Sequence, residues 1–191
     1  DKKTQSDQCH AVDKDENSDF MVLLNVWQRY EEQRQELSQN QLRQYCRKQF
    51  LNFMRMREWR DIHRQILIAC KQLGFKEVDH EERQYDSIHR ALLAGLFTQV
   101  ANKMDESKEM LGCRSRKLSI FPGSMLFKPP PQWVMAAELV ETSKLYARIV
   151  AKIDPQWVED YAAPFVKRQY FDPHFERNQG CVVAFEQVSL Y

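Results

Sequence analysis

Cationic and aromatic residues alternate along one predicted strand, and this spacing is the clearest chemical signal in the chain. Within residues 145–153, Tyr146, Arg148 and Lys152 fall on one face, because successive side chains of a strand point to opposite faces. A single nucleic-acid strand needs cations for its phosphates and a ring on which a base can stack. We therefore predict contact with a single strand here, with packing against another domain as the alternative.

A second cationic row lies on a predicted helix. Arg57, Arg60 and Arg64 are spaced i, i+3 and i+7, which places them on one helical face where they could hold phosphates. The alternative is a solvated face on which these arginines pair with Glu58 and Asp61, since such surface pairs are common and weak.

Further candidates occupy predicted turns, where side chains are exposed. They are the basic group Arg114, Arg116 and Lys117, the small donor Ser124 after Gly123, Lys128 before three prolines, and Lys144 in a predicted hairpin turn. For Arg114, Arg116 and Lys117 the alternative is packing against another domain, and for Ser124 and Lys128 it is an ordinary turn or loop. The large aromatic residues Phe121, Phe127, Trp133 and Trp157 are expected in the core, as aromatics at strand positions usually are.

Several chemistries are missing from the sequence. The five glycines form neither a GxxxxGK[ST] nor a GxGxxG loop, and no GxSxG or HExxH motif occurs. The five cysteines are widely spaced without a CxxC pair, so we expect no disulfide framework, no metal site, and reduced, mostly buried thiols. The chain by itself is thus predicted to be non-catalytic, with no cofactor of its own.

Hydrophobic periodicity predicts that helices position the first half. Four amphipathic segments are expected: one from the cap Ser18 through 31–36, one behind a capping box at Ser38, one from Met56 to a stop at Gly74, and one over 85–100. Gly95 in the last segment suggests close approach of another element. Together these segments predict an all-α helical bundle. Residues 1–17 have almost no large apolar side chain and are expected to be a linker.

The second half is predicted to be mainly strand, with a domain boundary near residues 103–110. Strands are expected at 110–113, 116–121, 133–140, 145–153 and 182–188, with a helix from Pro155 towards Lys167 between the fourth and the fifth. On the fourth strand, Leu145, Ala147, Ile149, Ala151 and Ile153 are expected to face the core. The fold class is therefore α+β: a helical bundle followed by a five-stranded OB-like barrel.

Seven segments in this order resemble the C-terminal region of bacterial HrpA-type DEAH-box RNA helicases. They are SDFMVLLNVW (18–27), FLNFMRMREWRDIHRQI (50–66), IHRALLAGL (88–96), IFPGSMLF (120–127), AAELVETSKLYAR (136–148), IDPQWVED (153–160) and VAFEQVSLY (183–191). The resemblance implies that residues 1–17 link to an upstream winged-helix domain, 18–104 form a ratchet-like bundle, and 107–191 form an OB-fold. It also implies that ATP and Mg bind in RecA-like lobes outside this chain.

The resemblance implies an accessory module that grips single-stranded RNA and closes a channel over the ATPase lobes. Its other partners would be the RecA-like and winged-helix domains of the same polypeptide, in a cytoplasmic monomer without membrane segments. The charge balance leaves a second hypothesis open. With 28 basic and 27 acidic residues the chain has no overall attraction for phosphate, which favours a docking platform with little RNA contact.

Overall fold

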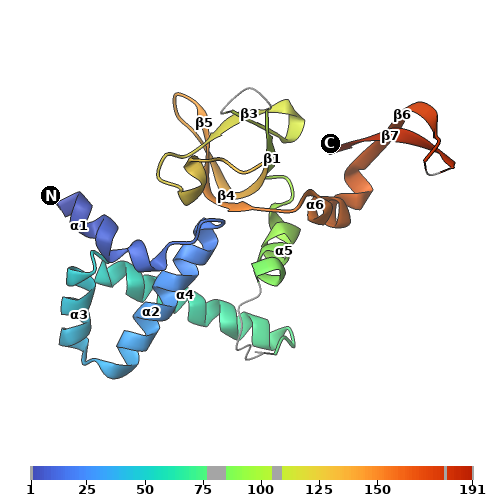
Figure 1. Ribbon diagram of the computed structural model, residues 1–191. Helices are drawn as coiled ribbons and strands as arrows, with labels where there is room; N and C mark the ends of the chain where they lie inside the picture. The colour runs from blue at the N-terminus through green and yellow to red at the C-terminus, as the bar shows by residue number, and fades with distance from the viewer. Residues whose placement is uncertain (1, 77–84, 105–108, 179, 191) are drawn as a thin grey trace. The chain divides into compact units, whose positions relative to one another are not determined.

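The computed structural model describes residues 2–76, 85–104, 109–178 and 180–190 (Figure 1). The chain divides into two compact units, one made of residues 1–15 and 20–83 and the other of residues 16–19 and 84–191. The first unit is α-helical and the second contains all the described strands. A helical part followed by a β-barrel is the predicted fold class.

The α-helical unit is built from α1 (Lys2–Cys9), α2 (Asp19–Glu36), α3 (Gln39–Lys48) and α4 (Phe53–Gln72). The predicted capping box is confirmed, because Ser38 Oγ accepts from Gln41 N and Gln41 Oε1 accepts from Ser38 N. Gly74, with φ of +83°, follows the end of α4 as expected. A small core joins the three longer helices through the buried residues Val26, Tyr30, Leu42, Cys46 and Met56.

Residues before α2, which were expected to be a linker, contain two short helical elements. They form α1 and a 3-10 turn, Ala11–Asp13. Asp13 is 2% exposed, where its carboxylate pairs with Arg29 and its backbone carbonyl accepts from Asn25 Nδ2 at 3.1 Å. These partners lie on α2, and a buried carboxylate with a guanidinium partner does not need a large apolar surface. The role of residues 1–17 as a linker stays a prediction.

The second unit contains a closed five-stranded barrel. Its strands are β1 (Val100–Lys103), β2 (Met110–Gly112), β3 (Lys117–Ile120), β4 (Trp133–Glu141) and β5 (Leu145–Lys152), in the order β1-β2-β3-β5-β4. All neighbours are antiparallel except β3 and β5. Nine buried side chains fill the interior: Ala101, Met110, Leu118, Ile120, Leu126, Val134, Ala136, Ala147 and Val150. The predicted OB-like barrel is confirmed.

The first barrel strand was not predicted as a strand. Val100 continues the four-residue spacing of Leu92 and Leu96, so it was assigned to a helix. In the structure α5 (Tyr85–Leu96) ends earlier, and Val100 pairs with Met135 of β4. Helix α5 belongs to the same compact unit as the barrel, whose range starts at residue 84 rather than within 103–110. Gly95 also lacks the predicted close neighbour, since no heavy atom of another described element lies within 4 Å of where its Cβ would be.

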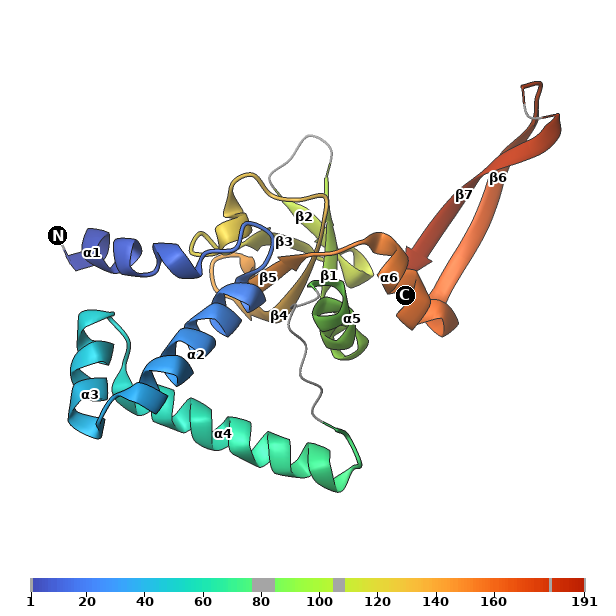
Figure 2. The same ribbon diagram turned by 60° about the horizontal axis from the view of Figure 1, so that its bottom comes forward.

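The predicted fifth strand lies outside the barrel. Residues 182–188 belong to β7 (Cys181–Leu190), which pairs only with β6 (Val166–Glu176) as a two-stranded hairpin (Figure 2). Helix α6 (Pro155–Ala162) follows the last barrel strand and does not reach Lys167. A 3-10 turn containing Pro164 intervenes, because proline has no N–H to continue an α-helix.

Within the described ranges, no helix is long and apolar enough to span a bilayer.

Candidate nucleic-acid interface

Three side chains form a cluster where β3 ends beside β5. Phe121 N donates to Ala147 O at 2.9 Å, which brings the ring of Phe121 to Tyr146, edge to face at a centroid distance of 6.1 Å. The guanidinium carbon of Arg148 lies 5.0 Å from the centre of the Phe121 ring. We call Phe121, Tyr146 and Arg148 the aromatic–cation cluster; it offers a ring for a base and a charge for a phosphate.

Phe121 was expected in the core but is 40% exposed. Ile120 before it is 3% exposed and fills the barrel interior, so the alternation of strand side chains turns Phe121 outward. The other three aromatics follow the prediction more closely: Phe127 packs against the barrel core, Trp157 is 9% exposed and Trp133 is half-buried.

The turn after Phe121 holds the ring in place. Ser124 N donates to Phe121 O at 2.9 Å, and a Cβ at Gly123 would lie only 2.9 Å from Cε1 of Phe121. The predicted donor Ser124 has a local role, since its Oγ accepts from Leu126 N at 3.1 Å and caps the next 3-10 turn. The close approach predicted at Gly123 is therefore to the cluster's own ring.

The predicted common face of Tyr146, Arg148 and Lys152 is interrupted. Ile149 has a φ of +53°, and Val150 is fully buried in the barrel interior instead of sharing the exposed face. Its backbone N–H is donated at 2.8 Å to Oδ2 of Asp19, whose Oδ1 accepts from Met125 N at 2.9 Å. Simple alternation fails here because a side-chain carboxylate takes the place of a strand partner.

Two basic candidates pair with exposed acids. Arg148 Nη1 lies 3.4 Å from Glu138 Oε1, and Lys144 Nζ lies 3.7 Å from Glu109 Oε1. Lys144 sits in the turn between β4 and β5, and Glu109 precedes β2, so the pair joins two loops that OB-folds commonly use for oligonucleotides. Exposed pairs of this kind contribute roughly 0–1 kcal/mol, so a phosphate can replace the carboxylate.

The turn before β3 carries charge with no such partner. Arg114, Arg116 and Lys117 are exposed, and none of them forms an ion pair within the described part of the chain. Arg114 and Ser115 have φ values of +57° and +56°, which makes the turn tight. Lys128 lies with Nζ 5.4 Å from the centre of the Phe127 ring, and Lys152 is exposed at the end of β5.

The helical arginine row is split. Arg60 Nε lies 3.1 Å from Glu31 Oε1 of α2, while Arg57 and Arg64 are exposed without an ion pair among the described residues. Glu58, the expected partner of the row, instead accepts from Arg55 Nη1 at 2.9 Å. This row belongs to the α-helical unit, whereas all other candidates belong to the barrel unit.

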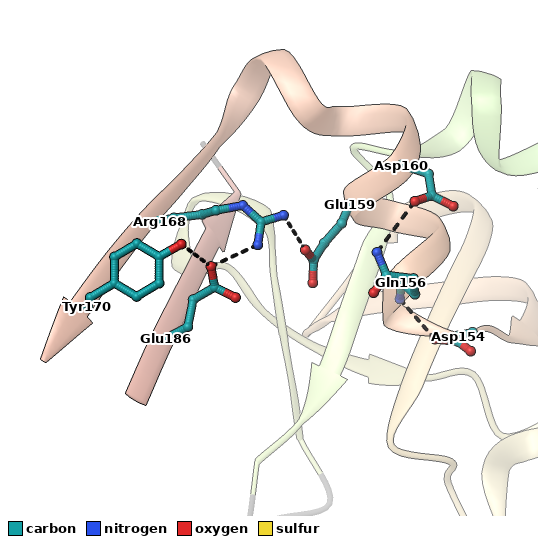
Figure 3. A network of polar contacts seen from close by, with 7 residues as sticks. All are labelled: Asp154, Gln156, Glu159, Asp160, Arg168, Tyr170 and Glu186. Carbon is teal, nitrogen blue, oxygen red and sulfur yellow. Dashed lines mark hydrogen bonds and ion pairs between the residues drawn. The ribbon is translucent and has the colours of Figure 1, made fainter. Parts of the chain in front are cut away.

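A polar network that the sequence reasoning missed links the hairpin to α6 (Figure 3). Arg168 donates to Glu159 at 2.6 Å and to Glu186 at 3.0 Å, and Tyr170 Oη donates to Glu186 at 2.7 Å. The Tyr170 hydrogen bond, followed by that of Arg168, lowers the pKa of Glu186, and the same hydrogen bond raises the pKa of Tyr170. The signal available beforehand was the i, i+2 spacing of Arg168 and Tyr170.

The hairpin also exposes apolar side chains. Tyr170, Phe171, Phe175, Val182 and Phe185 are each more than half exposed, at 52–70%. The strand register places Phe171 and Phe185 on one face, where their rings stack at 5.7 Å, and Tyr170 on the other. Cys181 is exposed here too; only Cys46 is buried and the other three cysteines are half-buried, so the prediction of mostly buried thiols was wrong.

No group of three or more His, Cys, Asp or Glu side chains that could hold a metal ion occurs among the described residues.

Comparison with known proteins identifies both the fold and the relatives. A family described as the oligonucleotide/oligosaccharide-binding (OB)-fold matches residues 88–165, which include the barrel. The whole chain is 48% identical to ATP-dependent RNA helicase HrpA of Escherichia coli and 44% identical to its homologue in Haemophilus influenzae. It is 29% identical, over 87% of its length, to the pre-mRNA-splicing factor ATP-dependent RNA helicase prp22 of Schizosaccharomyces pombe.

The matched region is a small part of these relatives, at 15% of the Escherichia coli protein and 14% of the other two. The similarity to the two HrpA proteins extends over the length of the chain, as does the resemblance of the seven segments noted in the sequence. The OB-fold match lies in the part of the chain that forms the barrel. The chain is thus homologous to an OB-fold-containing segment of the HrpA-type ATP-dependent RNA helicases.

Proposed function

We propose that the chain is a non-catalytic accessory module of an ATP-dependent RNA helicase, and that it binds single-stranded RNA and closes an RNA channel over ATPase lobes located elsewhere in the polypeptide. In this proposal α2, α3 and α4 belong to the ratchet-like part and the barrel from β1 to β5 is the OB-fold, with ATP and Mg bound outside the chain. The aromatic–cation cluster is the observation that carries the proposal, because an exposed ring beside an exposed guanidinium suits stacking and phosphate contact together.

The test is fluorescence anisotropy of the 191-residue chain with a labelled single-stranded RNA across a salt series. Phe121→Ala should weaken binding by about 5- to 150-fold, since stacking on a ring contributes roughly 1–3 kcal/mol per base. Arg148→Glu should lower the salt slope by about one, as expected when one phosphate contact is lost.

Matched controls come from the hairpin, which has rings and cations of similar exposure. Phe185→Ala and Arg177→Glu should leave both the affinity and the salt slope unchanged, because neither residue belongs to the cluster. Equal losses in the cluster and control variants would remove the cluster from RNA binding. An absence of binding at low salt would show that this chain does not grip RNA without further domains, against the proposal.

A docking platform is the second candidate, and the exposed hairpin favours it. A two-stranded hairpin is marginal alone in water, and this one exposes aromatic rings on both faces. Residues 166–190 contain three basic and three acidic side chains, so the surface suits protein rather than phosphate. The occupant we propose is the remainder of the helicase polypeptide, because the relatives matched over the full chain are more than six times as long.

Thiol labelling tests the docking candidate. Cys181 lies in the hairpin and is exposed, so it should react rapidly with a maleimide in the 191-residue chain and slowly in the full-length helicase. The labelling of Cys181 in the same two proteins unfolded in urea serves as the reference. Equal reactivity of Cys181 in the two proteins would leave the hairpin uncovered and would reject this occupant.

A further inference from the structure

We infer that the cavity beside the turn between β2 and β3 binds one nucleotide unit of single-stranded RNA, with the phosphate held by Arg114 and Arg116. This inference deepens the proposed RNA-binding function and rests on it for the identity of the ligand. The cavity has a volume of about 450 Å³, within the range of roughly 300–1,000 Å³ usual for small-molecule sites.

The cavity lining includes two cations whose charge is not neutralised by a neighbouring acid. Arg114 and Arg116 both line the cavity, and no carboxylate of the described residues pairs with either. In contrast, Arg148 and Lys144 on the same barrel each have an acidic neighbour. Two arginines that line one cavity suit a phosphate, which accepts several hydrogen bonds from such planar donors.

The lining also contains apolar and neutral polar residues. Val100, Leu118 and Leu139 line the cavity, and so does Gly112, where an added Cβ would lie only 2.9 Å from Leu118 Cδ2. Thr98 and Gln99 also line the cavity; the hydroxyl and the side-chain amide can each donate and accept. A lining that combines apolar, polar and cationic side chains matches a nucleotide, whose base is flat and apolar on its faces and polar at its edge and whose phosphate is anionic.

Cys113 provides a built-in reporter, because its half-buried thiol lines the same cavity. Burial raises the pKa of this thiol, so labelling is followed at mildly alkaline pH and resolved by peptide mass spectrometry. The 191-residue chain is labelled in the presence of oligouridylate, uridine monophosphate or inorganic phosphate at matched ionic strength. The exposed Cys181 serves as the internal reference.

At a ligand concentration about ten times Kd, labelling of Cys113 should slow about tenfold with either uridine ligand, since only the unliganded fraction reacts. Arg114→Gln with Arg116→Gln should abolish this protection. Lys117→Gln should retain it, because Lys117 is the adjacent exposed cation but does not line the cavity. The labelling of Cys181 should be unaffected throughout.

Three outcomes would overturn the inference: no protection by either uridine ligand, equal protection in all variants, or protection by inorganic phosphate as strong as by the nucleotide. Protection by the monophosphate but not by the oligonucleotide would assign the cavity to a free nucleotide and also overturn it. This readout does not depend on the aromatic–cation cluster. Loss of RNA binding in Phe121→Ala with Cys113 still protected by the monophosphate would separate the two sites.

Discussion

The barrel and the hairpin are both built from strands of the same compact unit, yet they differ in how much of their apolar side-chain surface is buried. The barrel closes on itself, and its nine interior side chains are at most 4% exposed. The hairpin has two strands, and five of its large side chains are 52–70% exposed. Closure removes open edges and buries one face of every strand. The barrel therefore buries its own apolar surface, whereas the hairpin leaves much of its apolar surface exposed.

Polar groups differ in the same way. In the barrel, the carboxylate of Asp19 satisfies two backbone N–H groups, of Met125 and Val150, at 2.9 and 2.8 Å. In the hairpin, the carboxylate of Glu186 instead binds two side chains, Arg168 and Tyr170, at the surface. A carboxylate that replaces a strand partner is part of the fold, whereas one in an exposed network mainly sets the geometry of its neighbours.

The largest expected difference between the two regions is in the cost of truncating a side chain. Met110→Ala should lower the free energy of unfolding by about 2–5 kcal/mol, because Met110 is fully buried in the barrel and leaves a cavity. Phe175→Ala in the hairpin should change it by no more than about 0.5 kcal/mol. Urea denaturation measures both, with Leu111→Ala, next to Met110 but 38% exposed, as the control. Similar costs for Met110 and Phe175 would break the comparison.

A smaller loss is expected from Asp19→Asn. The amide retains one carbonyl acceptor for two backbone donors and has no charge, so the unfolding free energy should fall by roughly 1.5–3 kcal/mol. The near-isosteric change isolates hydrogen bonding from packing. Glu141→Gln at the exposed end of β4 is the matched control and should have almost no effect. An Asp19→Asn variant as stable as the parent in the same urea experiment would show that the two hydrogen bonds do not stabilise the barrel.

Local rules predicted the elements whose causes are local. The capping box at Ser38, the stop at Gly74 and the pairing of β4 with β5 across a short turn each depend on residues close in sequence. The rules failed where a distant group decided the outcome. Val100 follows a helical spacing but pairs with Met135, and Val150 turns inward where Asp19, over a hundred residues away, takes its N–H.

The candidate site was predicted in part for the same reason. The spacing of Tyr146 and Arg148 on a strand was visible in the sequence, and these residues do lie together. Phe121 was wrongly assigned to the core. Its burial depends on which face of β3 turns inward, and the sequence does not show that Ile120, rather than Phe121, packs in the barrel interior. The network of Arg168 and Glu186 depends on the register of the hairpin, which brings together two residues that are 18 positions apart in sequence.

Gly123→Ala should affect the function of the cluster without affecting the barrel. Its Cβ would press on Cε1 of Phe121, an exposed ring that can rotate away, so the unfolding free energy should change by less than about 0.5 kcal/mol. RNA affinity in the anisotropy assay should fall, but by less than in Phe121→Ala, because the ring is displaced and not removed. Gly180→Ala in the hairpin is the control for RNA affinity. Unchanged affinity for Gly123→Ala would mean that the position of the ring is unimportant.

The smallest effect concerns pH and is confined to the hairpin. Because the pKa of Glu186 is lowered from its ordinary value of 4.5, the network stabilises the hairpin fully above pH 4.5, and this stabilisation is lost as the pH falls through the lowered pKa. Carboxyl-carbon NMR titration of Glu186 measures this directly. Tyr170→Phe should move the pKa of Glu186 back towards 4.5 by more than Arg168→Gln does, since the Tyr170 hydrogen bond is the larger cause. Arg177→Gln, outside the network, should leave it unchanged. A Glu186 that titrates at its ordinary value in the parent chain would show that the network does not hold the base of the hairpin.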